Sequence, residues 1–248
     1  MHLKYLLTMI CLIMLAGCGH QPVKKTTITV SAAASLKDAL GDIKKNYEKI
    51  HPNINIVYNF GASGTLSNQI QAGAPADLFF SASTKDMTKL TAGGDIKQED
   101  STPLLKNRLV IISSKKLTSP ADLTDSAVNK IAVGTPETVP AGMYAKSALT
   151  HLHLWSQLQP KIVYTKDVRQ VLTYVESGNV DAGIVYLTDA LTSKSARLTL
   201  ADNLHEPIVY PLGIVRATKH RQAAHDFYQY MQSAHSKKVY QSYGFTVQ

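Results

Sequence analysis

Four short segments of the sequence have the residue types of an anion-binding site. Ser35 and Ser63 each stand where an apolar run gives way to a helical pattern, and two similar junctions begin at Ala141 and Val168. The first turn of a helix offers backbone N–H groups without intrahelical partners and a partial positive charge, so it is suited to bind an anion. Serine adds a hydroxyl donor, and the neighbouring alanine and glycine residues let the backbone approach a ligand closely. The pattern therefore predicts a site in which neutral donors hold a small dianion.

General magnitudes show that such a site would be strong enough. A hydrogen bond to a charged group contributes about 1.5–3 kcal/mol, so roughly six to eight of them give about 9–24 kcal/mol, against an association cost of about 4–15 kcal/mol. Lys37 and Arg169 stand one or two residues beyond the junctions, and no cation stands at the expected contacts themselves. Taken alone, each serine is better explained as a helix N-cap. Their repetition in one chain favours a ligand site.

The segments that must position these residues alternate between strand and helix patterns. Apolar runs of strand length precede the junctions, and helical periodicity follows, as in Leu36, Leu40, Ile43 and Tyr47 on one face. This alternation predicts an α/β fold with mainly parallel sheets, in which ligands bind at the carboxyl ends of the strands. The strand candidates are residues 28–30, 54–60, 78–80, 109–112, 131–134, 162–164, 182–186 and 208–215.

A fold of two domains would require structured crossings, because no Pro/Gly-rich linker interrupts the chain. The candidates are Leu109–Ile112 on the way out and Ile208–Val215 on the way back. The first domain would then be discontinuous.

The N-terminus has the pattern of an export signal. An apolar run from Tyr5 to Leu15 follows one lysine and ends in Leu-Ala-Gly-Cys, with Cys18 where cleavage is expected. The run is too short to span a bilayer. We therefore expect residues 1–17 to be a lipoprotein signal peptide, Cys18 to be the lipidated first residue and residues 18–27 to form a tether. The protein would be exported and anchored to the outer face of the cell membrane, or to its periplasmic side in a cell with two membranes.

Composition narrows the choice of function. Two cysteines in 248 residues exclude a disulfide scaffold and a zinc site of several thiolates. The formal charge of +8 suits nucleic acid, a membrane surface or a small anion. The basic residues are dispersed, and the chain carries an export signal, so nucleic acid is not expected as a partner.

The motifs around the junctions resemble the periplasmic molybdate-binding proteins of ABC transporters. The resemblance covers about residues 27–248, and its most specific parts are Val139-Pro140-Ala141-Gly142 and Gly183-Ile184-Val185-Tyr186. The first of these belongs to a longer matching segment, Val133-Gly134-Thr135-Pro136-Glu137-Thr138-Val139-Pro140-Ala141-Gly142. The other motifs that carry it are Ala32-Ala33-Ala34-Ser35-Leu36, Phe60-Gly61-Ala62-Ser63-Gly64-Thr65-Leu66, Gln71-Ala72-Gly73-Ala74-Pro75-Ala76-Asp77-Leu78-Phe79, Asp167-Val168-Arg169 and Tyr243-Gly244-Phe245-Thr246.

The resemblance implies a type 2 periplasmic-binding-protein fold, with two α/β lobes joined by a two-segment hinge. Lobe 1 would comprise residues 28–108 and 209–248, and lobe 2 residues 109–208. The implied ligand is molybdate, and usually tungstate, with no cofactor and no direct protein ligand to the metal. The implied contacts are the hydroxyls and amides of Ser35 and Ser63, the amides of Ala141 and Val168, and the hydroxyl of Tyr186. The implied partners are a membrane permease and its cytoplasmic ATPase, with the protein itself a monomer.

Chemical arguments disfavour phosphate as the anion but do not separate sulfate from molybdate. Phosphate usually keeps a proton and requires an acceptor, and Asp167, the one carboxylate near the contacts, is better explained as a helix cap. Sulfate, molybdate and tungstate are all fully deprotonated at neutral pH. The choice between sulfate and molybdate depends on cavity radius, so a binder of sulfate or another tetrahedral anion remains an alternative.

Enzyme functions are weaker alternatives. Gly61-Ala62-Ser63-Gly64-Thr65 nearly matches the nucleophile elbow of a serine hydrolase, but its last glycine is displaced. Ser113-Ser114-Lys115-Lys116 fits Ser-x-x-Lys without its companion motifs. His151 with His153, and His205 with Glu206, lack the rest of a metal-binding pattern. We therefore expect a binding protein and no catalysis.

Overall fold

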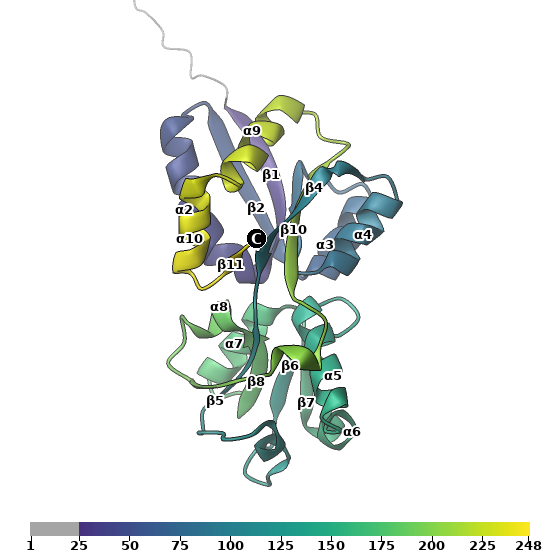
Figure 1. Ribbon diagram of the computed structural model, residues 1–248, viewed down its shortest axis with the longest axis vertical. Coiled ribbons are helices and arrows are strands. Elements are labelled where there is room, and N and C mark those ends of the chain that lie inside the picture. The colour runs from purple at the N-terminus through teal and green to yellow at the C-terminus, as the bar shows by residue number, and fades with distance from the viewer. Residues whose placement is uncertain (1–24) are drawn as a thin grey trace, which may run out of the picture.

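The computed structural model describes residues 25–248 and consists of two α/β lobes stacked along the long axis (Figure 1). The expected signal peptide 1–17, the expected lipidation site Cys18 and most of the expected tether 18–27 lie outside the described residues. Among residues 25–248, no helix combines the length and hydrophobicity needed to cross a membrane.

Lobe 1 is built on a six-stranded sheet in the order β11-β4-β10-β3-β1-β2. Its strands are β1 (Thr26–Ala33), β2 (Ile54–Gly61), β3 (Leu78–Phe80), β4 (Ile96–Lys106), β10 (Val209–Val215) and β11 (Thr246–Val247). Its helices are the 3-10 turn η1 (Ala34–Leu36), α2 (Lys37–Ile50), α3 (Ser63–Gln71), α4 (Thr84–Ala92), α9 (Arg221–Met231) and α10 (Ala234–Ser242).

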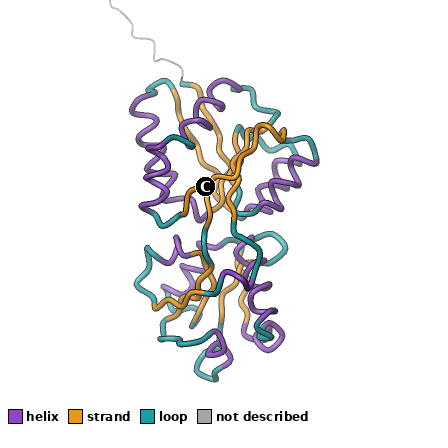
Figure 2. The backbone as a smooth tube through the Cα atoms, viewed as in Figure 1, coloured by secondary structure: helices purple, strands orange, loops and turns teal. Residues whose placement is uncertain are grey.

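Lobe 2 is built on a five-stranded sheet in the order β7-β6-β8-β5-β9. Its strands are β5 (Leu109–Ser113), β6 (Ile131–Gly134), β7 (Ile162–Thr165), β8 (Ala182–Tyr186) and β9 (Ala196–Thr199). Its helices are η2 (Pro120–Thr124), α5 (Pro140–His151), α6 (Trp155–Leu158), η3 (Gln159–Lys161), α7 (Val168–Glu176) and α8 (Leu187–Ala190), with η4 (Asp202–Leu204) on the way back to lobe 1. In both lobes the strands lie at the centre and helices flank them (Figure 2).

Amphipathic periodicity explains how the helices cover the sheets. Leu36, Leu40, Ile43 and Tyr47 are all buried, as their spacing predicts. The same holds for α7, whose buried face consists of Val168, Val171, Leu172 and Val175. Burying these faces on the two sheets fixes where each helix begins, and therefore where its first amides lie.

The expectation of mainly parallel sheets is wrong. Of the nine strand pairs in the described residues, four are parallel and five are antiparallel. The antiparallel pairs all involve β5 or β10, which enter their sheets from the other lobe, or the β4–β11 edge. A strand that arrives without a crossover helix is free to run antiparallel to its neighbours. The sheets are mixed because the chain changes lobe twice.

The two crossings lie just outside the segments expected for them. Leu109–Ile112 lies inside β5, and the outward crossing is made by Asn107 and Arg108. The return crossing lies between β9 and β10, before most of Ile208–Val215. The two connecting segments run side by side, since the Asn107 N–H donates to the Ile208 carbonyl at 3.1 Å.

Candidate functional site

The parallel strands of each lobe bring their following loops to one edge of the sheet. In lobe 1, Ala33 at the end of β1 is paired with Gly61 at the end of β2, so Ser35 and Ser63 leave the sheet together. In lobe 2, Gly134 at the end of β6 is paired with Thr165 at the end of β7. The starts of α5 and α7 follow these ends. Both edges face the junction between the lobes (Figure 1).

Neither Ser35 nor Ser63 occupies an N-cap position, although that is the role expected for each serine taken alone. The Ser35 hydroxyl lies in η1, 2.9 Å from the hydroxyl of Tyr210. Ser63 is the first residue of α3, and Ala62 occupies the N-cap position without a side-chain cap. The Ser63 hydroxyl accepts a hydrogen bond from the Ala82 N–H at 2.9 Å. Because a hydroxyl that accepts one bond keeps its own proton for another partner, Ser63 is held in place as a donor.

The first turns of α5 and α7 present backbone amides. Pro140 is the first residue of α5, so the N–H of Ala141 is the first donor of that helix. In α7, the Asp167 side chain caps the helix by accepting from the Gln170 N–H at 2.9 Å. The capping role expected for Asp167 is thus confirmed. Its carboxylate is engaged with Gln170, and the Val168 amide remains one of the uncapped donors of the first turn.

Tyr186 ends β8 with a buried hydroxyl that has no hydrogen-bond partner in the described part of the chain. The side chain is 1% exposed, and its ring lies 5.7 Å from that of Tyr210. Burial, reinforced by Tyr210, raises the pKa of the Tyr186 hydroxyl well above its usual value, so it stays protonated. Leaving a buried hydroxyl unpaired costs about 1–3 kcal/mol. Binding of an acceptor-rich ligand would explain why the Tyr186 hydroxyl is retained in spite of this free-energy cost.

The lobes touch beside these donors. The Gly64 N–H of lobe 1 donates to the Thr138 carbonyl of lobe 2 at 3.0 Å. A Cβ on Gly64 would lie 2.6 Å from that carbonyl oxygen, so a glycine is needed for this approach. Beside it, the crevice between Lys85, Asp86 and residues 136–140 has a volume of only ≈ 10 Å³. The two lobes are therefore closed against each other at this point.

A hydrogen-bond network that the sequence pattern did not indicate links the site to the crossing segments. The Asn107 amide donates to the Thr188 hydroxyl at 2.9 Å and to the Tyr210 hydroxyl at 3.2 Å. Tyr210 is in turn in contact with Ser35. These partners lie 81 to 175 residues apart in sequence, and no short motif connects them.

Charged groups stand at the rim of the site and include one buried carboxylate. Asp189 on α8 is 0% exposed, and its Oδ1 accepts from Arg169 Nη1 at 3.3 Å. Burial raises the pKa of Asp189 to about 7, and the Arg169 guanidinium opposes that rise. On its other side, Arg169 pairs with Asp38 of lobe 1. The sequence pattern gave no indication of this chain of charges, because an aspartate in a short helix is typical of a surface.

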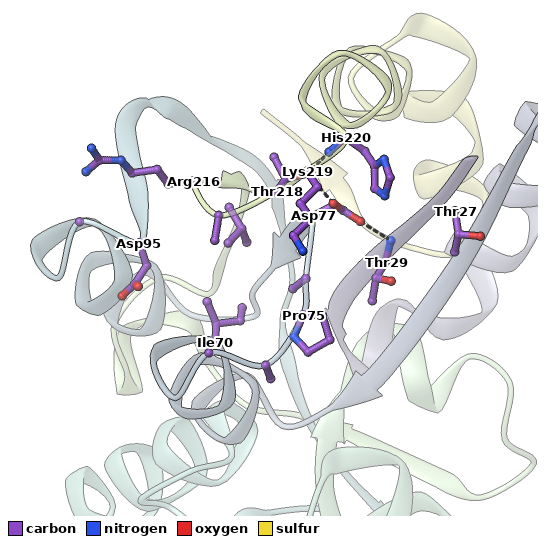
Figure 3. A pocket seen from close by; sticks show the side chains of 16 residues that line it. Thr27, Thr29, Ile70, Pro75, Asp77, Asp95, Arg216, Thr218, Lys219 and His220 are labelled. Carbon is purple, nitrogen blue, oxygen red and sulfur yellow. Dashed lines mark hydrogen bonds between the residues drawn. The ribbon is translucent and has the colours of Figure 1, made fainter. Parts of the chain in front are cut away.

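A second cavity, of ≈ 870 Å³, lies at the opposite edge of the lobe 1 sheet (Figure 3). Thr29 and Asp77 in its wall stand towards the amino ends of β1 and β3, roughly 20 Å of strand length from Ser35. The Asp77 carboxylate accepts from the Thr29 N–H at 2.7 Å and from the Thr218 hydroxyl. This carboxylate joins β1 to the loop after β10. None of the predicted ligand residues lines the larger hollow, so it is not the predicted anion site.

The features that suggested an enzyme have structural partners. Ser63 has neither a histidine nor a carboxylate as its hydrogen-bond partner. The Ser113 hydroxyl donates to the Asp181 carbonyl at 3.0 Å, and His205 Nδ1 lies 2.8 Å from the Glu206 carbonyl. Within residues 25–248, no group of three or more His, Cys, Asp or Glu side chains is placed to hold a metal ion.

Known proteins resemble this chain along nearly its whole length. A profile described as bacterial extracellular solute-binding protein matches residues 28–246. A Bacillus subtilis protein with the provisional name of ABC transporter substrate-binding lipoprotein is 52% identical over 247 residues, which is 95% of this chain and 94% of that protein. The molybdate-binding protein of Haemophilus influenzae is 38% identical over 246 residues, 94% of this chain and 95% of that protein. The solved periplasmic molybdate-binding protein of Azotobacter vinelandii aligns at a TM-score of 0.82 and 26% identity over 89% of this chain and 99% of its own.

Proposed function

Because the chain belongs to the bacterial extracellular solute-binding protein family, we propose that it captures molybdate outside the cytoplasm and delivers it to an ABC importer. The observation that carries this proposal is the buried Tyr186 hydroxyl of lobe 2, which has no hydrogen-bond partner among residues 25–248 and whose ring lies beside Tyr210, the partner of Ser35 in lobe 1. It supports the expectation that neutral donors from both lobes meet at one junction. An oxyanion with acceptors on every side would engage all of them at once. Two relatives that align along nearly the whole chain carry the name of molybdate-binding proteins.

The proposed ligands are the hydroxyls and amides of Ser35 and Ser63, the amides of Ala141 and Val168, and the Tyr186 hydroxyl. Their support is local. Ser63 is fixed as a donor by Ala82, Asp167 caps α7 through Gln170, and Tyr186 keeps a free hydroxyl. Contact with both lobes makes binding favour closure, since a ligand shifts a population by its differential affinity for the two states.

Tungstate, which has the same charge and shape, is included in the proposed specificity. Sulfate remains the alternative ligand, because neutral donors would also accept that smaller dianion. The protein would release its cargo unchanged, with no cofactor and no chemical step.

Lipid attachment at Cys18 would hold the protein on the outer side of the membrane, where it would meet a permease with a cytoplasmic ATPase. A relative named as a lipoprotein supports the anchor, and the extracellular family supports export. We propose a monomer, since both halves of the site come from one chain.

A thermal-shift panel of molybdate, tungstate, sulfate and phosphate tests the proposal. An anion at a hundred times its Kd stabilises the folded protein by about 2.7 kcal/mol. For a chain of this size that corresponds to a rise in Tm of about 5–10 °C. We expect this rise with molybdate and tungstate and none with phosphate. A rise with sulfate and none with molybdate would replace the proposed ligand by the alternative.

A further inference from the structure

Arg169 lies between two carboxylates that belong to different lobes. Its Nη1 donates to Asp189 Oδ1 of lobe 2 at 3.3 Å, and its Nη2 pairs with Asp38 Oδ2 of lobe 1. The remaining ion pairs of the described residues lie within one lobe, apart from Arg108–Asp202, which joins the two connecting segments. In this part of the chain, the contact of Arg169 with Asp38 is therefore the one ion pair that joins lobe to lobe.

The lobe 2 half of this arrangement is permanent. Asp189 on α8 and Arg169 on α7 belong to the same lobe, and Asp189 is completely buried, with no partner for its Oδ2 among residues 25–248. Oδ1 can accept from a guanidinium whether or not the carboxyl is protonated. Asp189 therefore keeps Arg169 directed toward the rim of the site in both open and closed positions of the lobes.

The lobe 1 half depends on closure. Asp38 lies in the first turn of α2, three residues after Ser35, and its side chain is 37% exposed while that of Arg169 is 23% exposed. A carboxylate at a helix N-terminus is stable in water without a partner. Asp38 therefore does not require Arg169 to fold, and separation of the lobes would break the pair at little cost to either lobe.

We propose that Arg169 is a positioning residue for oxyanion capture, which binds Asp38 when the lobes close and so holds the first turn of α7 against η1. This proposal rests on the proposed function. Val168, whose amide is a proposed ligand, precedes Arg169 directly, and η1 carries Ser35. The pair thus joins the two chain segments that would contact the ligand from opposite sides, without touching the ligand itself.

Asp38→Asn is the primary test, because a partly exposed carboxylate is replaced by an amide of the same shape, at only a small cost to helix stability. We expect the Kd for molybdate, measured by calorimetry, to rise about 5- to 30-fold. The loss should appear as faster release of labelled molybdate into excess unlabelled molybdate, with association little changed. Asp38→Glu, which keeps the carboxylate, should bind more tightly than Asp38→Asn.

Arg169→Gln and the double variant test whether the two residues act as one unit. If they do, Asp38→Asn adds no more than about twofold to the Kd of Arg169→Gln. Arg221→Gln is the matched control, since Arg221 pairs with Asp100 inside lobe 1 at 2.6 Å. Its Kd should stay within about twofold of wild type.

The results separate the two proposals. If Asp38→Asn keeps the wild-type Kd and release rate, Arg169 has no positioning role, while the proposed function stands. If the wild-type protein itself does not bind molybdate, the proposed function fails and this inference fails with it. A ligand-free Tm of Asp38→Asn equal to that of wild type confirms that the effect belongs to closure and not to folding.

Discussion

The two edges of the lobe 1 sheet differ in open volume and in the hydrogen-bonding capacity that they leave for a ligand. The edge at the amino ends of β1 and β3 has the larger hollow, ≈ 870 Å³, yet both carboxylate oxygens of Asp77 in its wall accept hydrogen bonds from within the protein. The edge at the carboxyl ends meets lobe 2 beside a crevice of only ≈ 10 Å³, and at this junction Ser63 of lobe 1 and Tyr186 of lobe 2 keep bonding capacity. Buried polar groups are normally hydrogen-bonded, so a buried donor that keeps bonding capacity needs an explanation, and a bound ligand is one. Bonding capacity therefore favours the carboxyl edge as the proposed site, whereas volume alone favours the amino edge.

Among the variants that test this comparison, we expect Ser63→Ala to have the largest effect on molybdate binding. Loss of one hydrogen bond to a dianion costs about 1.5–3 kcal/mol, which corresponds to about a 10- to 150-fold higher Kd for molybdate in calorimetry. Ser236→Ala is the control, because Ser236 is a buried serine of the same lobe whose hydroxyl donates to the Tyr230 carbonyl at 2.7 Å. The control should lower stability and leave the Kd unchanged. Equal affinities for Ser63→Ala and wild type would remove Ser63 from the site.

Tyr186→Phe should separate affinity from stability. We expect about tenfold weaker molybdate binding, from the loss of a donor to a charged ligand. The ligand-free protein should be as stable as wild type, or more stable by about 1 kcal/mol, because an unpaired buried hydroxyl is removed. Urea unfolding without ligand measures this.

Tyr210→Phe provides the contrast to that variant. It removes the contacts with Ser35 and Asn107 and should destabilise the ligand-free protein by about 1 kcal/mol or more. A large loss of stability in Tyr186→Phe would mean that its hydroxyl has a structural partner, and would contradict the assignment.

The smallest effect on binding is expected at the opposite edge. Asp77→Asn weakens the bonds from Thr29 and Thr218, so the free energy of unfolding should fall by about 1–3 kcal/mol. The Kd for molybdate should remain within about twofold of wild type. A tenfold loss of affinity in the folded variant would show that the larger hollow takes part in binding.

Much of the fold could be predicted from the alternation of apolar runs and helical periods. Helix faces such as Leu40–Ile43–Tyr47 are local patterns, and burial confirms them. The two-lobed α/β fold and the resemblance to molybdate-binding proteins are confirmed by the alignments. The predicted parallel direction was wrong for β5 and β10, which enter their sheets from the other lobe. A short apolar run predicts a strand but does not indicate from which lobe the chain enters the sheet.

The site was predictable only in part, for a physical reason. A junction such as Asp167–Val168 shows its helix start in the sequence, and its capping is confirmed. The partner of a hydroxyl depends on the tertiary structure: Ser35 contacts Tyr210, which is 175 positions away. Asp189 is likewise buried, although an aspartate in a short helix is typical of a surface. The ligand contacts themselves remain predictions.

The two connecting segments are bonded to each other, at Asn107 with Ile208 and in the register of Lys106 with Val209. A single strand could swivel about its own axis and let one lobe rotate freely. Two bonded segments restrict rotation about either one, which is the arrangement expected of a hinge between domains. Lobes joined in this way would approach and separate with the same two faces opposite each other.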